Sequence, residues 1–82
     1  MKVQAQISLY PLRSSELGEP IRRFVELIRQ EGLDVEVGPM STQVTGDSEL
    51  LFARLAEAFE DASQRGDMVL LLKVSNACPE GK

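Results

Sequence analysis

The first residues of the chain alternate between apolar and polar side chains, which is the pattern of a β-strand with one buried face. Apolar side chains stand at every second position from Val3 to Leu9, and the intervening positions are polar. Tyr10 continues the polar set, and Pro11 follows it. Because proline removes a backbone donor, the strand is expected to end near Pro11.

The next segment repeats its apolar residues with the period of a helix. They follow the spacing i, i+3, i+4 and i+7, at Ile21, Phe24, Val25 and Ile28. Pro20 suits a first helical turn, and Gly32 suits the position just beyond a helix end. These features predict a helix over 19–31.

Two short runs with strand character follow, over 33–37 and 40–46, and Gly38-Pro39 joins them. A Gly-Pro pair between such runs is typical of a turn linking two antiparallel strands. Asp47 or Ser48 can then cap a second helix, which is expected to stop at Gly66. Its apolar stripe is expected at Phe52, Leu55, Ala56 and Phe59.

The last strand is predicted from Met68 to Val74, with a centre that is apolar on both faces. The element order is therefore βαββαβ. Two right-handed crossovers place both helices on one face of an antiparallel sheet. This predicts an α+β, ferredoxin-like sandwich with strand order 4-1-3-2, formed by a single domain over residues 1–82.

The composition excludes several kinds of catalytic site and partner. The 82 residues carry a net charge of −4 and include no histidine and one cysteine. Without histidine, a Ser-His-Asp triad and a Cys-His dyad are excluded within one chain, and the scattered carboxylates lack the spacing of a metal site. An acidic chain with scattered basic residues argues against nucleic acid as a partner. The longest apolar run, five residues, is too short to cross a membrane.

The cysteine count and the first ten residues indicate the cellular compartment. A lone cysteine cannot form an internal disulfide, and the first ten residues lack the apolar block of a secretory signal. We therefore expect a cytoplasmic protein.

The face of the sheet turned away from the helices is predicted to be almost free of charge. The first strand offers Gln4, Gln6, Ser8 and Tyr10 to it, and the last strand offers Val69 and Leu71. A face that meets only water normally carries charged residues. We therefore expect a second subunit or a ligand to cover this face.

Three segments together resemble the YkoF-like thiamine-binding family. The opening strand, 6–12, reads QISLYPL; the hairpin strand, 38–46, reads GPMSTQVTG; and the exit from the last strand, 74–79, reads VSNACP. The element order and length agree with that family along the whole chain.

The resemblance implies a non-enzymatic protein that binds thiamine or its hydroxymethylpyrimidine half, for thiamine salvage, transport or sensing. It implies a homodimer or homotetramer built through sheet faces or edges. The ligand-binding residues that it implies are Ser8, Tyr10, Met40, Ser41, Thr42, Asn76 and Cys78. Hydroxyl and amide groups can match the donors and acceptors of an aminopyrimidine, and an aromatic ring or a thioether suits its flat face.

The predicted topology separates these residues. The last strand runs opposite to the first, which sends Asn76 and Cys78 to the far end of the sheet, about 25 Å from Tyr10. Either the tail belongs to a partner's site or only one cluster binds, and a site shared between subunits is favoured.

Two other functions compete with ligand binding of this kind. One is a ferredoxin-like oligomerisation or ACT-like regulatory module that binds no thiamine. The other is an acyl phosphatase, for which Arg13 is the nearest candidate, although no glycine-rich cradle precedes it.

Overall fold

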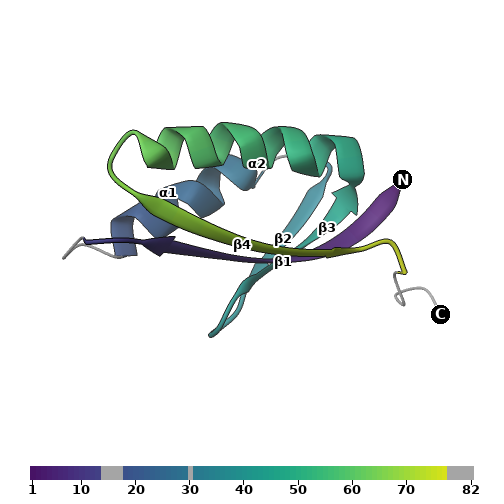
Figure 1. Cartoon of the computed structure of the whole chain (residues 1–82). Coiled ribbons are helices and arrows are strands. Elements are labelled where there is room, and N and C mark those ends of the chain that lie inside the picture. The colour runs from purple at the N-terminus through teal and green to yellow at the C-terminus, as the bar shows by residue number, and fades with distance from the viewer. Residues whose placement is uncertain (14–17, 30, 78–82) are drawn as a thin grey trace.

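The computed structural model describes residues 1–13, 18–29 and 31–77 and contains four strands and two helices in the predicted order. The elements are β1 (Lys2–Pro11), α1 (Gly18–Ile28), β2 (Leu33–Val37), β3 (Thr42–Asp47), α2 (Ser48–Ser63) and β4 (Met68–Ser75). Both helices lie on one face of the sheet, and the other face is uncovered (Figure 1). The ferredoxin-like sandwich is confirmed.

The sheet has the order β2-β3-β1-β4 with every neighbouring pair antiparallel, which is the predicted order read from the other edge. β1 therefore lies in the interior, while β2 and β4 form the two edges. The first residues of β1 and the end of β4 lie at the same end of the sheet (Figure 1).

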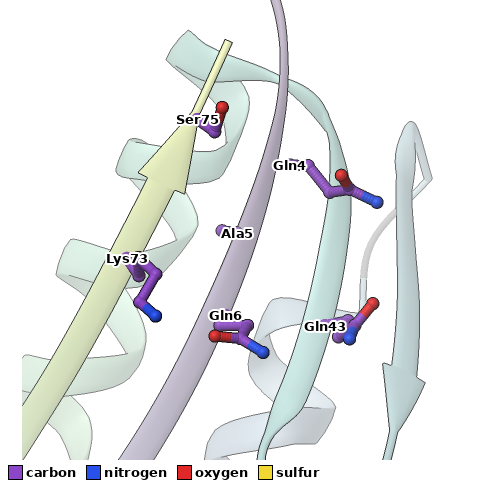
Figure 2. Close-up of a pocket in the computed structure, with 6 residues that line it drawn as sticks. All are labelled: Gln4, Ala5, Gln6, Gln43, Lys73 and Ser75. Carbon is purple, nitrogen blue, oxygen red and sulfur yellow. The ribbon is translucent and has the colours of Figure 1, made fainter. Parts of the chain in front are cut away.

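The face turned away from the helices, here called the open face, carries the polar set predicted for β1. Its hydrogen-bonded neighbours align Gln4 with Ser75 and Gln6 with Lys73 on β4, and Gln6 with Gln43 on β3. Figure 2 shows these side chains standing on the same side of the sheet. The face is less neutral than predicted, because Lys73 lies on it, and Asp34 and Glu36 of β2 align with its β3 residues.

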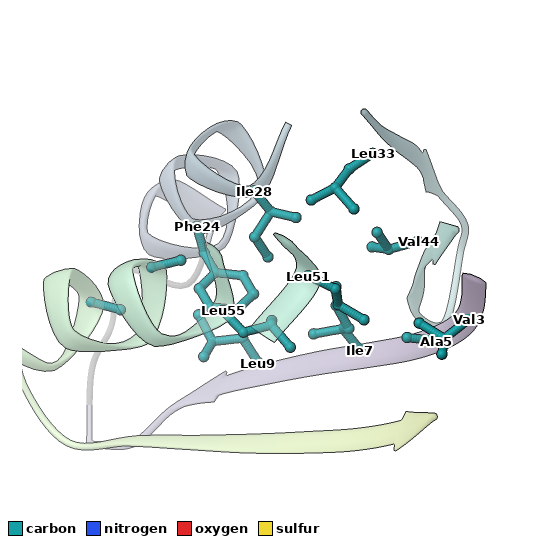
Figure 3. Close-up of a cluster of buried hydrophobic side chains, with 12 residues drawn as sticks. Val3, Ala5, Ile7, Leu9, Phe24, Ile28, Leu33, Val44, Leu51 and Leu55 are labelled. Carbon is teal, nitrogen blue, oxygen red and sulfur yellow. The ribbon is translucent and has the colours of Figure 1, made fainter. Parts of the chain in front are cut away.

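The core lies between the two helices and the face of the sheet that they cover (Figure 3). Ile28 and Leu51 are fully buried there against Val44 of β3. The stripe predicted for the second helix is wrong in part, because α2 buries Leu51, Leu55, Ala58 and Ala62. Phe52 and Ala56 lie one position further around the helix and are exposed.

Capping decides where the helices begin and end. Asp47 is the N-cap of α2, and its Oδ2 accepts hydrogen bonds from the backbone of Glu49 (3.1 Å) and Leu50 (3.4 Å). α1 ends at Ile28 and not at 31, and α2 ends at Ser63, short of Gly66. After Ser63 the backbone N–H groups of Gln64, Arg65 and Gly66 each donate to the oxygen three residues earlier, so the chain tightens into a turn before Gly66.

Gly46 serves packing between β3 and the start of β2. A Cβ placed there would lie 2.7 Å from the backbone oxygen of Gly32, closer than real Cβ atoms approach. Backbone packing therefore explains the glycine that ends the hairpin motif.

Candidate functional site

A hollow of about 310 Å³ lies where β1 runs on past the end of β3. The last β1–β3 pair is Ile7 with Thr42, whereas β1 continues to pair with β4 as far as Pro11 with Met68. The last four residues of β1 therefore have β4 on one side and the hairpin connection on the other. We call this hollow the notch.

The β2–β3 connection forms the wall opposite β1. Gly38 donates a backbone hydrogen bond to the Ser41 oxygen at 2.9 Å, which closes a tight turn. The tip of this hairpin projects away from the helices (Figure 1). The notch is thus built from a strand end, a turn and, on the helix side, Ile21 of α1.

The lining combines exposed apolar surface with a few half-buried hydroxyls. Tyr10 is 47% exposed and Met40 is 87% exposed, so both present apolar surface to the notch. Ser8, Ser41 and Thr42 are half-buried beside them. An apolar cleft with a small number of convergent polar groups is the usual form of a small-molecule site.

Five of the seven residues predicted to bind ligand line this one hollow: Ser8, Tyr10, Met40, Ser41 and Thr42. They come from two segments about thirty positions apart in the sequence, and the antiparallel pairing of β1 with β3 brings them together. Their contact with a ligand stays a prediction.

Asn76 lies at the other end of the sheet, as the predicted topology requires. Its Nδ2 lies 3.9 Å from the sulfur of Met1. Tyr10 pairs with Val69, and Asn76 lies seven positions after Val69, a distance of about 23 Å along the strand. Cys78 lies outside the described residues. One chain therefore does not bring Asn76 to the notch.

Sequence reasoning missed the apolar rim of the notch. Ile21 was assigned to the buried stripe of the first helix, yet it is exposed and lines the notch, as does Val37 at the end of β2. The helical spacing identifies which residues share a face, but the position of the hairpin decides which of them remain uncovered.

Two further hollows follow the open face from the notch toward the other end of β1. The nearer, about 240 Å³, is lined by residues that include Gln6, Ser8 and Leu71. The farther, about 250 Å³, is lined by Gln4, Ala5, Gln6, Gln43, Lys73 and Ser75 (Figure 2).

The perturbed carboxylates lie away from the notch. Hydrogen bonds from Arg23 and Arg65 lower the pKa of Asp61, on the helix layer, to about 2. The amino group of Met1 lies 3.0 Å from Asp47 Oδ1, and it lowers the pKa of that carboxyl together with the backbone donors of α2. Both shifts belong to structural ion pairs and caps.

Neither a metal nor a membrane is indicated by the described residues. Residues 1–13, 18–29 and 31–77 contain no group of three or more Cys, Asp or Glu that could hold a metal ion. None of the helices in the same ranges is long and apolar enough to span a membrane.

The fold and the notch define a class of protein, the ferredoxin-like α+β domain with a small-molecule-sized cleft at one end of its sheet. Within that class, the chain belongs to the thiamine-binding protein family, whose model matches residues 5–76. Curated protein sequences give no significant match to the chain.

Solved structures share the fold of this chain. A Thermotoga maritima protein assigned provisionally to thiamine biosynthesis or salvage is 32% identical, with 92% of this chain and 83% of that chain covered at a TM-score of 0.81. A hypothetical protein of Methanocaldococcus jannaschii is 25% identical, with 96% and 84% covered at a TM-score of 0.85. A Streptococcus pneumoniae protein shares the fold at 21% identity, with 96% and 90% covered and a TM-score of 0.86.

Proposed function

We propose that the protein binds thiamine or its hydroxymethylpyrimidine half in the notch, without catalysing a reaction, in thiamine salvage, transport or sensing. The observation that carries this proposal is the convergence of Ser8, Tyr10, Met40, Ser41 and Thr42 on one hollow of about 310 Å³ in a chain of the thiamine-binding family.

The side chains suit an aminopyrimidine. Tyr10 and Met40 present a ring and a thioether that can contact the flat face of the heterocycle. The hydroxyls of Ser8, Ser41 and Thr42 can each donate to a ring nitrogen and accept from the exocyclic amine. A net charge of −4 also favours a ligand that carries a thiazolium cation.

The direct test is isothermal titration calorimetry with thiamine and then with hydroxymethylpyrimidine. The protein is first unfolded and refolded so that any ligand carried through purification is lost. We expect micromolar binding of at least one compound, about −8 kcal/mol. An absence of heat with both compounds, in a protein that is folded and oligomeric, would replace this proposal with that of an oligomerisation or regulatory module.

We further propose that two copies pair through the outer edge of β4. Exposed edge strands usually carry charges that block pairing, and β2 follows this rule with Asp34 and Glu36. The outer strand β4 carries one charge, Lys73, and exposes the apolar side chains of Val69, Leu71 (57% exposed) and Leu72 (38% exposed).

The helix layer also exposes an apolar side chain on the side of the β4 edge. Asp61 of α2 faces α1, because its carboxylate binds Arg23 at 2.8 Å. Phe52 is nine residues away, which at about 100° per residue puts it on the opposite side of α2. Phe52 is 49% exposed and therefore turns its ring away from α1, beyond the edge of the layer. Apolar groups on the strand and on the helix thus share one side of the molecule.

Antiparallel pairing of two β4 strands would also shorten the distance between Asn76 and the notch. Residues directly opposite each other must share a face, so the two-fold axis passes through a residue, and the apolar centre of β4 offers Leu71 or Leu72 for it. Either register brings the end of the partner's β4 beside the start of β4, two strand spacings or about 10 Å from Tyr10. The partner's Asn76 then lies nearer to the notch than the Asn76 of the same chain does.

A further inference from the structure

Among the described residues, no carboxylate forms an ion pair with Lys73, a cation on the open face. Five of the six described arginines form ion pairs with Asp or Glu, at positions 13, 22, 23, 54 and 65. None of the ion pairs found within 1–13, 18–29 and 31–77 involves Lys73, whose side chain is exposed. Its charge is therefore available to an anion.

Amide and hydroxyl groups surround this charge. Lys73 pairs with Gln6 across the β1–β4 ladder, and Gln6 pairs with Gln43 across the β1–β3 ladder. Gln4 and Ser75 pair with each other two positions further along and close the hollow of about 250 Å³ (Figure 2). Carboxamides and a hydroxyl can all donate hydrogen bonds to oxygen, so the hollow suits a small oxyanion beside a single ammonium.

An intermediate hollow shares lining residues with both the hollow around Lys73 and the notch. The intermediate hollow of about 240 Å³ has Gln6 and Lys73 at one end and Ser8 and Ser41 at the other, and the last two residues also line the notch. From Tyr10 to Gln6, which faces Lys73, the path is four residues of β1, about 13 Å. An elongated ligand with a ring in the notch would therefore extend toward Lys73 along the open face.

We infer that Lys73 binds the phosphate of a phosphorylated ligand, so that the protein prefers the monophosphate ester of thiamine to thiamine itself. This inference rests on the proposed binding of thiamine in the notch. Thiamine carries its hydroxyl on an arm at the end remote from the pyrimidine, and esterification of that hydroxyl puts a phosphate at the ligand's far end. With the pyrimidine beside Tyr10, the phosphate falls on the Lys73 side, where an ammonium and amide donors replace its water.

Calorimetry with thiamine and with thiamine monophosphate tests this on four proteins: wild type, Lys73→Met, Lys73→Arg and Arg29→Met. The methionine keeps the apolar stem and removes the charge, and the arginine restores a charge. Arg29 is an exposed cation just beyond α1, on the helix layer, so Arg29→Met removes the same charge away from the open face. We expect wild type to bind the monophosphate about fivefold more tightly than thiamine, as for a partly exposed ion pair.

Lys73→Met is expected to abolish this preference while leaving thiamine binding unchanged, and Lys73→Arg is expected to retain it. Arg29→Met is expected to behave as wild type. Equal affinity of the wild type for the two ligands would overturn the role of Lys73. So would an equal loss of affinity for thiamine and for its monophosphate in Lys73→Met. In both cases the proposed thiamine site would stand. Failure of both ligands to bind wild type would overturn the proposed function and this inference with it.

Discussion

Ile7 of β1 pairs with Thr42 of β3, and this pair is the last one that the two strands form. Beyond it, β1 continues for four residues beside β4 alone. The mismatch in length opens the notch, since a hairpin that paired further would fill the same space with its own strand. The candidate site is thus a consequence of where one ladder of hydrogen bonds stops.

Thr42→Val and Tyr10→Ala are expected to weaken thiamine binding. Valine keeps the shape of threonine and removes a hydroxyl, which costs about 1 kcal/mol, or roughly fivefold in affinity. Loss of the Tyr10 ring is expected to cost about tenfold, since it removes a face on which the heterocycle packs. Calorimetry measures both effects.

The matched control for the hydroxyl is Thr45→Val, at the other end of β3, where Thr45 lies opposite Gln4. We expect this control to bind as wild type does. Thermal melts check that the fold is kept in all three variants. Wild-type affinity in both Thr42→Val and Tyr10→Ala would remove the notch as the binding site.

Mixing two weakened variants tests whether the site is shared between subunits. Tyr10→Ala and Asn76→Ala are each expected to weaken binding at every site, because each removes one side of every shared site. Statistical exchange makes half of the dimers mixed, and each mixed dimer holds one intact site, so about a quarter of all sites recover. Titration of the mixture after unfolding and refolding together counts them.

No sites of wild-type affinity in the mixture, with both single variants weakened, would mean that Tyr10 and Asn76 act in the same chain. Wild-type binding by Asn76→Ala alone would show that the tail takes no part in the site.

Leu72→Glu is expected to reduce the oligomer to a smaller species. In either two-fold register, Leu72 faces Leu72 or Leu70 of the other copy, so a carboxylate there meets another carboxylate or apolar surface. Light scattering coupled to size exclusion measures the mass. The matched control is Val37→Glu, which puts the same charge on the other edge strand, and its mass is expected to equal that of wild type.

Gln6→Glu separates an edge contact from a contact between open faces. It adds a charge at the centre of the open face and leaves the β4 edge unchanged, so we expect the mass to stay the same. A reduced mass with Gln6→Glu and an unchanged mass with Leu72→Glu would assign the subunit contact to the open faces.

Acid is expected to weaken the contact between the two helices through Asp61. Its carboxylate accepts hydrogen bonds from Arg23 (2.8 Å and 3.2 Å) and Arg65 (3.0 Å), and its pKa falls from 3.8 to about 2. Because the folded state has the lower pKa, the stabilisation is fully present above about pH 5 and is lost as the pH falls through 3.8 toward 2.

Chemical denaturation of wild type and Asp61→Asn across this range provides the measurement. We expect the difference in the free energy of unfolding to be largest near neutral pH and to shrink between about pH 5 and pH 2. Asp34→Asn makes the same substitution on the edge strand β2 and is the control for the substitution itself. A constant difference for Asp61→Asn would contradict the role of the ion pairs.

The sequence by itself determined the order of elements and the layout of the sheet. Alternation in β1, helical spacing in α1 and turn residues at Gly38-Pro39 are local signals, and the right-handed crossover rule leaves one arrangement for βαββαβ. The same alternation identified the polar residues of the open face. Resemblance in three segments then supplied five residues that converge on the notch.

Tertiary structure decided what local patterns leave open. Whether α2 buries Leu51 or Phe52 depends on how the helix rotates against the sheet, and both stripes satisfy the same period. The exposure of Ile21 depends on a hairpin that is remote in sequence, and the position of Lys73 among amides depends on the registers of β1 with β3 and β4. Such features arise from contacts between distant segments, so only the folded chain defines the notch and the two hollows that follow it along the open face.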